Sequence, residues 1–211
     1  MDLYPAIADE RRASADLLAG LSTGQLATPS LCEAWTIRDV GAHLLMPLVT
    51  SGPKFGYALL RNRMDFNRAS EMLTAQVARR SDAEIVAGLR DNADHRFTPP
   101  GLGPEAPLTD LIIHGQDMRR PLGLAHDVGP QRLVVVLGFL TGPDARRGFV
   151  PSERIEGLTF RATDLDWTAG AGPEVAGPAE AVLMAIAGRA VALDELTGPG
   201  VAELRARLDP V

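Results

Sequence analysis

The stretch that decides the fold is Thr36-Ile37-Arg38-Asp39-Val40-Gly41-Ala42-His43-Leu44-Leu45. Thr36 is a favourable helix N-cap, and Asp39, three residues later, resembles the second half of a capping box. The apolar residues of the helix recur at helical spacing and are Ile37, Val40, Leu44 and Leu48. His43 lies at the edge of this stripe, so we expect a helix that holds an imidazole where its buried face meets a cleft. A histidine in such a position is more often a hydrogen-bonded structural residue than a ligand. Whether His43 is a ligand therefore depends on which other residues could bind a metal with it.

A second stretch, Leu108-Thr109-Asp110-Leu111-Ile112-Ile113-His114-Gly115-Gln116-Asp117-Met118-Arg119-Arg120, contains a carboxylate and an imidazole four residues apart. On a helix, Asp110 and His114 stack one turn apart, and Asp117 falls in the same sector. This pair can bind a divalent metal from the side of the helix, and His43 could supply a third ligand. Three protein ligands leave one position open for water or substrate, as a catalytic zinc requires. The alternative is a structural hydrogen bond between Asp110 and His114 on a half-exposed helix.

Two segments, TPSLCEAWTIRDVGAHLL (residues 28–45) and LTDLIIHGQDMRRPLG (residues 108–123), resemble the mycothiol-dependent maleylpyruvate isomerase family, part of the wider DinB/YfiT-like metalloprotein group. The segment LTFRATDLDWTAGAGPEVAGPAEAVLMAIAGRAVALDELTG (residues 158–198) resembles the small C-terminal part of those proteins. Members of the family bind zinc through one histidine of the second helix and a carboxylate and a histidine on a later helix. The resemblance implies that His43, Asp110 and His114 are the metal ligands. The family's carboxylate is usually glutamate, so the shorter aspartate here can alter metal affinity or the position of the helix.

The resemblance and the sequence pattern together predict a mainly α fold. A DinB-like four-helix bundle that binds the metal is expected over residues 1–145, and a small α/β C-terminal subdomain over residues 150–211. Helices are predicted at residues 5–21, 37–49, 55–80, 81–94, 107–120, 131–140, 179–191 and 201–208. The buried side of the long amphipathic segment 55–80 is predicted to contain Leu59, Leu60, Met64, Phe66, Leu73 and Val77. Alternation at residues 158–162 and 165–169 predicts two strands with a turn near Asp164, followed by a glycine-rich turn region at residues 170–177.

The composition excludes several functional classes. The 211 residues carry a net charge of −6, and their basic residues form no cluster with interleaved aromatics, so no nucleic-acid partner is expected. No run of about 18 apolar residues exists, so neither a membrane-spanning segment nor a membrane partner is expected. A single cysteine and no signal peptide at the start of the chain predict a cytoplasmic protein. Lys54 is the only lysine beside many arginines, which suggests a GC-rich, actinobacterial genome and agrees with mycothiol, an actinobacterial thiol.

The expected chemistry is the activation of a thiol. A zinc ion with an open position can bind a thiol and hold it as a thiolate at neutral pH. The thiolate can add reversibly to an activated double bond and so catalyse cis–trans isomerisation, or it can attack an electrophilic carbon in an S-transfer. We therefore expect a divalent metal, with zinc as the first candidate, mycothiol as cosubstrate and a small electrophile as substrate, in a monomer or homodimer. Nickel, manganese and iron also suit two histidines and an aspartate.

Other residues near these motifs have predicted roles with ordinary alternatives. Asp117 is predicted to act as a base or to orient an imidazole. Arg119 and Arg120 are candidates for binding a carboxylate or a sugar hydroxyl of the cosubstrate, although positive charge at a helix C-terminus is also favourable by itself. Cys32 could be a thiolate near the metal, but a small packed residue is the ordinary interpretation. Two other functions remain open, a hydrolase with metal-activated water and a non-enzymatic stress or metal-binding protein.

Overall fold

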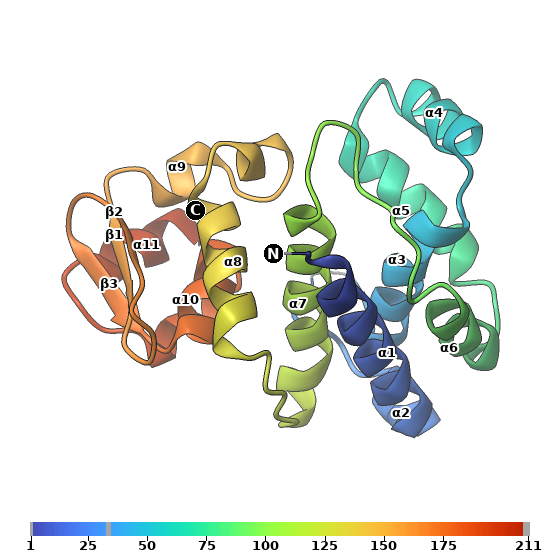
Figure 1. Ribbon diagram of the computed structural model, residues 1–211, viewed down its shortest axis with the longest axis horizontal. Coiled ribbons are helices and arrows are strands. Elements are labelled where there is room, and N and C mark those ends of the chain that lie inside the picture. The colour runs from blue at the N-terminus through green and yellow to red at the C-terminus, as the bar shows by residue number, and fades with distance from the viewer. Residues whose placement is uncertain (1, 33–34, 209–211) are drawn as a thin grey trace. The chain divides into compact units, whose positions relative to one another are not determined.

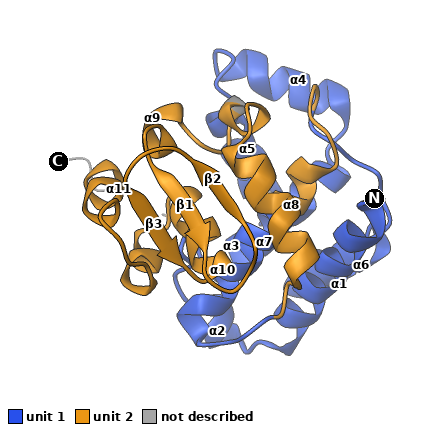
Figure 2. Cartoon of the chain, turned by 60° about the vertical axis from the view of Figure 1, so that its left-hand side comes forward, with its two compact units in different colours: residues 1–99, 110–126 blue, residues 100–109, 127–211 orange. Residues whose placement is uncertain are grey.

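The computed structural model describes residues 2–32 and 35–208, which form helices and one small sheet (Figure 1). Two compact units make up the chain (Figure 2): unit 1 contains residues 1–99 and 110–126, and unit 2 contains residues 100–109 and 127–211. The sequence-based division at residues 145–150 differs from these limits and stays a prediction about folding domains. No helix among the described residues is long and apolar enough to cross a membrane.

Unit 1 is helical. Its elements are α1 (Tyr4–Gly20), α2 (Thr23–Leu26), α3 (Ile37–Val49), α4 (Gly52–Arg61), α5 (Phe66–Val77) and α6 (Asp82–Asp91), most of α7 (Glu105–Arg119), and the 3-10 helix η1 (Arg120–Leu122). Capping boxes begin α2, α3 and α6, where the side chains of Ser22, Thr36 and Ser81 accept hydrogen bonds from backbone N–H groups three residues later. The sequence therefore determines locally where these three helices begin.

The core of unit 1 lies between α1, α3, α5, α6 and α7. It contains the fully buried side chains Ile7, Leu45, Leu73, Leu89 and Ile112, one from each of these helices. Helices α1 and α3 approach closely at Gly41, because a Cβ there would lie 2.6 Å from Leu18 Cδ1. The glycine of the motif helix thus lets α3 pack tightly in the bundle, and this packing fixes where His43 lies.

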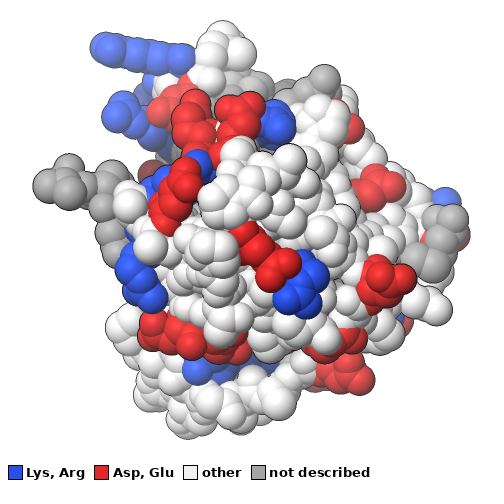
Figure 3. Space-filling view, turned by 90° about the vertical axis from the view of Figure 1, so that its left-hand side faces the viewer, with Lys and Arg blue, Asp and Glu red and all other residues white. Residues whose placement is uncertain are grey.

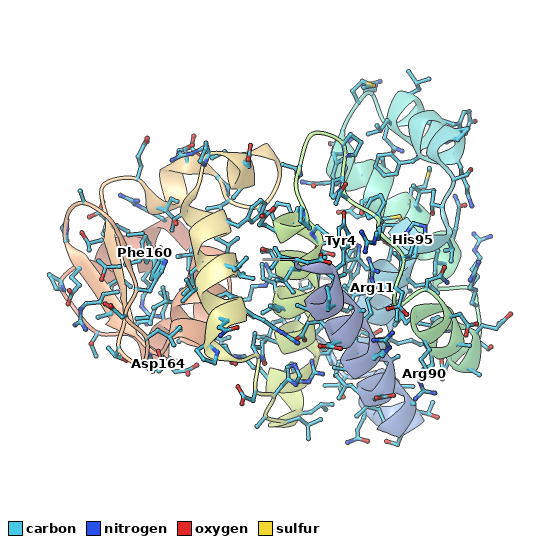
Figure 4. All side chains as sticks on the ribbon, viewed as in Figure 1. Tyr4, Arg11, Arg90, His95, Phe160 and Asp164 are labelled. Atoms are coloured by element: carbon cyan, nitrogen blue, oxygen red, sulfur yellow. The ribbon has the colours of Figure 1, made fainter. Side chains whose placement is uncertain are left out.

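A buried arginine anchors the chain after α6. Arg11 of α1 is 3% exposed, and its Nη1 donates to the carbonyl oxygens of Ala93 at 2.9 Å and His95 at 2.5 Å (Figure 4). Burial disfavours the charged guanidinium and lowers the pKa of Arg11 to about 10. These bonds hold the first residues of the segment that leads from α6 to α7.

Unit 2 contains the sheet. Its elements are α8 (Pro130–Thr141), η2 (Asp144–Arg147), α9 (Ser152–Ile155), β1 (Thr159–Ala162), β2 (Thr168–Gly170), β3 (Glu174–Gly177), α10 (Ala179–Ile186), η3 (Ala190–Glu195) and α11 (Val201–Leu208). The strand order is β2-β1-β3, in which β1 pairs antiparallel with β2 and parallel with β3. Phe160 of β1 is buried, and Asp164 Oδ1 accepts a hydrogen bond from the Ala179 backbone N–H at 2.8 Å, which links the turn after β1 to the start of α10 (Figure 4).

The expected fold class is confirmed, because the chain is mainly helical and has a small sheet in its C-terminal part. Two expected elements are wrong. The segment 55–80 is two helices, α4 and α5, and the break between them contains Arg63 and Met64 in left-handed backbone conformations with φ of 56° and 64°. The region 170–177 is not only a turn, since β3 occupies residues 174–177 and pairs with the distant β1.

Candidate metal centre

His43 is positioned by the start of α3. The Thr36 backbone N–H donates to Asp39 Oδ2 at 3.0 Å, and the Asp39 backbone N–H donates to Thr36 Oγ1 at 3.2 Å. This reciprocal pair satisfies two N–H groups that a helix start otherwise leaves without partners. The predicted capping box is therefore present, and it fixes the residue at which the helix that carries His43 begins.

The three predicted ligands meet at one point. Asp110 Oδ1 lies 3.5 Å from His114 Nε2 and 3.8 Å from His43 Nε2, and the two imidazole centroids are 4.8 Å apart. One ligand atom from each residue lies within 4.8 Å of the other two. Ligand atoms bound tetrahedrally at zinc distances are about 3.3 Å apart, so a small contraction would enclose one cation. The arrangement fits the predicted three-ligand site.

Both imidazoles turn their Nε2 atoms toward Asp110 and their Nδ1 atoms toward other residues. His114 Nδ1 lies 2.9 Å from Asp117 Oδ2, and His43 Nδ1 lies 3.3 Å from Thr74 Oγ1 of α5. Asp117 is completely buried and Thr74 is 2% exposed. An acceptor at Nδ1 fixes the tautomer with a free electron pair on Nε2, which is the form that binds a metal. Asp117 therefore lies where an orienting carboxylate is needed.

Two residues of this centre, Thr74 and Trp35, were not among the predicted site residues. Thr74 carries no signal in the sequence, because its contact with His43 spans 31 residues of chain. Trp35 precedes the Thr36 N-cap, and its ring centroid lies 4.8 Å from that of His43 and 6.4 Å from that of His114. An indole beside both histidines restricts their rotation and lowers the local polarity. Its position just before the N-cap of the histidine helix is the signal that could have identified it.

Cys32 lies near the same centre. One atom each from Cys32, His114 and Asp117 lie within 4.8 Å of one another, in a second group that could hold a metal and that shares His114 with the first. The Leu31 backbone N–H donates to the Asp117 carbonyl at 3.2 Å, and this bond holds the loop beside the end of α7. The first group contains two imidazoles at open Nε2 positions, whereas the second requires the carboxylate that already contacts His114 Nδ1.

The two arginines predicted to bind the cosubstrate are less exposed than expected for that role. Arg119 is 4% exposed, and it donates to the carbonyl oxygens of Gly115 and Ala13, each at 3.2 Å. Arg120 is half-buried in η1. The guanidinium of Arg119 thus links α7 to α1. Cosubstrate binding by Arg119 and Arg120 stays a prediction.

The other two histidines lie outside the centre. His95 is exposed. His126 has its Nε2 3.0 Å from Oε2 of the buried Glu10. Neither histidine belongs to a group that could hold a metal among the described residues. Of the four histidines, only the two predicted as ligands, His43 and His114, therefore lie together at this centre.

Comparisons with known proteins agree with this geometry. The family model described as the mycothiol maleylpyruvate isomerase N-terminal domain matches residues 7–119. The crystal structure of the mycothiol-dependent maleylpyruvate isomerase is similar, with a TM-score of 0.58 and 16% sequence identity over 94% of this chain and 96% of that one. A histidine-to-alanine mutant of that isomerase gives a TM-score of 0.55 at the same identity and coverage. None of the curated proteins matches this sequence.

At 16% identity the structural likeness concerns the fold, and it supports the expected DinB-like bundle with a small C-terminal part. The family match is the stronger finding for the site. It covers more than half of the chain and includes all of α3 with His43 and all of α7 with Asp110, His114 and Asp117. The chain belongs to the mycothiol maleylpyruvate isomerase N-terminal domain family.

Proposed function

We propose that this protein is a zinc-dependent enzyme that uses mycothiol to isomerise a small electrophilic molecule or to transfer sulfur to it. The observation that carries the proposal is the convergence of His43 Nε2, His114 Nε2 and Asp110 Oδ1. Two neutral imidazoles and one carboxylate form a ligand set of the kind found in catalytic zinc sites, which keep a position open. The proposal includes a cytoplasmic location, where low-molecular-weight thiols stay reduced.

The residues present fit a zinc ion. A bound zinc ion would lower the pKa of a thiol at its open position and hold the thiolate ready for attack. Asp117 Oδ2 and Thr74 Oγ1 lie where each can accept a hydrogen bond from an Nδ1–H group, and this tautomer leaves Nε2 of both histidines free for the metal. Asp110 takes the place of the longer glutamate that is usual in the family, and its Oδ1 lies within 3.8 Å of both Nε2 atoms. The shorter side chain is thus compatible with the site.

Beside the ligands, the chain supplies an apolar wall. The indole of Trp35 packs against His43 at a tilt of 41° and can exclude water from one side of the cation. Arg119 and Arg120 are proposed to hold a carboxylate or hydroxyl of the thiol cosubstrate. The family's use of mycothiol supports that thiol over others, and we extend it to this chain.

The test is a screen of the zinc-loaded protein against cis-configured activated alkenes and alkyl electrophiles. Each substrate is incubated with mycothiol, with glutathione or without thiol, and both product and free thiol are measured. An isomerase converts substrate only with mycothiol and leaves the thiol concentration unchanged, whereas an S-transferase consumes one thiol for each product formed. Turnover without thiol would instead indicate a hydrolase with metal-activated water, and no turnover of any substrate by metal-loaded protein would favour a non-enzymatic role.

A further inference from the structure

Unit 1 exposes a group of large apolar side chains on one corner, residues 52–68, which comprises α4, the break after it and the start of α5. Four of the seven large apolar side chains that are exposed in the described part of the chain lie here: Tyr57, Leu60, Met64 and Phe66, with exposures of 62%, 73%, 66% and 51%. Three of these four were predicted to be buried. Scattered exposed apolar residues are common, but a cluster of this kind marks a surface that binds something.

Helix α4 presents two kinds of side chain on its outer side. At about 100° per residue, the side chains follow one another around one side of the helix, from Lys54 and Arg61 beside the buried Ala58, through Tyr57, to Leu60 nearly opposite it. The inner side is fixed, since Phe55 packs against Phe66 of α5 with ring centroids 5.5 Å apart. The apolar and basic groups are therefore exposed side by side on α4. Helix α4 itself lies at an outer edge of unit 1 (Figures 1 and 2).

The break between α4 and α5 is held in a strained backbone conformation. Arg63 and Met64 both have positive φ, which is unfavourable for residues with a side chain. The Met64 backbone N–H donates to the Leu59 carbonyl at 2.8 Å, and Asp65 caps α5 by accepting from the Arg68 backbone N–H at 3.1 Å. Strain that the surroundings maintain is more frequent at functional positions than elsewhere. Met64 itself, within this break, is exposed.

The charge of the corner is opposite to that of the chain. Lys54, Arg61 and Arg63 are exposed, and no described residue forms an ion pair with them. The acidic residue of the corner, Asp65, is engaged with Arg68. The whole chain carries a net charge of −6, and Figure 3 shows acidic and basic side chains intermixed on another view of the surface. The corner thus combines apolar side chains with unpaired positive charge, which suits an anionic partner.

The geometry narrows the choice of partner. A symmetric dimer through this corner would place the same three cations opposite each other, which is unfavourable. Two surface cavities, of about 290 and 230 Å³, are both lined by residues outside the corner. A basic helix with aromatic and aliphatic side chains on an exposed edge is typical of proteins that bind a lipid surface.

We propose that residues 52–68 form a peripheral binding surface for an anionic lipid bilayer. Lys54, Arg61 and Arg63 contact phosphate headgroups, while Tyr57, Leu60, Met64 and Phe66 insert between the headgroups and the upper acyl chains. The expectation of no membrane partner rested on the lack of spanning segments, which this mode of binding does not need. Binding through one short surface is weak and reversible. The proposal is independent of the metal and of the reaction.

The test is sedimentation of the full-length protein with vesicles of phosphatidylglycerol and phosphatidylcholine in equal parts, compared with phosphatidylcholine alone. The protein is expected to bind the anionic vesicles at least about tenfold more strongly, since each basic residue at a charged surface contributes about fivefold. Arg61→Glu/Arg63→Glu is expected to lower binding by about 30-fold or more. Leu60→Ser/Phe66→Ser is expected to abolish the part of the binding that persists at high salt.

The matched control is Arg79→Glu/Arg80→Glu, which changes the net charge equally at two exposed arginines outside the corner and should retain binding. Equal binding to both kinds of vesicle would overturn the proposal, as would equal loss in the two arginine variants. The mass of the protein in solution is measured in parallel. A dimer that Leu60→Ser/Phe66→Ser converts to a monomer would identify a second copy as the occupant and would also overturn it.

Discussion

Two regions of unit 1 depart from the usual distribution of polar and apolar side chains, in opposite directions. Between α3 and α7, two histidines and a completely buried aspartate lie inside the bundle. On the corner formed by α4 and α5, Leu60 and Phe66 lie outside. Burying polar groups costs free energy unless they are paired, and exposing apolar groups forgoes stabilisation by burial. Departures of either kind indicate function, because folding alone does not favour them.

The largest expected effect follows from removing a ligand of the buried cluster. His114→Ala is expected to abolish stoichiometric metal binding, because it takes one of three ligands and the partner of Asp117. Metal content after gel filtration and titration with zinc measure the effect. His95→Ala is the control, since His95 is exposed and should leave one metal bound for each chain. Equal metal content in both variants would show that this cluster is not the metal site.

A smaller effect is expected from replacing Asp117, whose carboxylate contacts His114 Nδ1. Asp117→Asn replaces an acceptor for His114 Nδ1 by an amide that can present its NH₂ group instead. Metal affinity or activity should fall by about 100-fold, the upper end of the range for groups that orient metal ligands. The zinc dissociation constant, measured by competition with a chelator, is the readout. An unchanged constant would mean that Asp117 does not orient the ring.

Removing the Thr74 hydroxyl, which contacts His43 Nδ1, should lower metal affinity less than the change at Asp117. Thr74→Val keeps the shape of the side chain and removes the contact with His43 Nδ1, so we expect metal affinity to fall by about tenfold. Thr74→Ser retains the hydroxyl and should restore most of the affinity. A loss of equal size in the serine variant would show that packing of the methyl group, and not the hydroxyl, is what α5 contributes.

The smallest expected effect is that of a substitution in the exposed corner on the free energy of unfolding. Leu60→Ser should change the free energy of unfolding by less than about 0.5 kcal/mol, because the side chain is 73% exposed. Leu45→Ala, in the core of the same unit, should cost about 2–5 kcal/mol. Urea denaturation of both variants gives the comparison. A large destabilisation by Leu60→Ser would mean that the corner is part of the folding core and needs no partner.

How much could be predicted differs between these two regions. The spacing of Asp110, His114 and Asp117 is a local property of one helix, and the capping box at Thr36 sets the start of another, so both were read correctly from the sequence. The approach of His43 to α7 followed from the resemblance to a family. Thr74 could not be found, since its position depends on how α5 packs against α3.

The prediction for the corner, a single helix with its apolar side buried, was wrong because the spacing of apolar residues does not show where a helix ends. The apolar spacing in residues 55–80 fits one long helix. The two residues with left-handed backbone, Arg63 and Met64, are not glycines, so the sequence contains no signal for the break between the helices. In unit 2, β3 was missed for a related reason. Its four residues, Glu174–Gly177, follow a glycine-rich stretch and become a strand by pairing with β1, which lies earlier in the chain.

X-ray absorption at the zinc edge tests the central claim most directly. For the protein loaded with one equivalent of zinc and free of added thiol, the account predicts only nitrogen and oxygen neighbours at about 2.0–2.2 Å, including the imidazole pattern of two histidines. Addition of mycothiol should bring in one sulfur at about 2.3 Å. Failure to bind zinc, or a sulfur ligand before any thiol is added and absent in Cys32→Ser, would contradict a centre made of His43, Asp110 and His114.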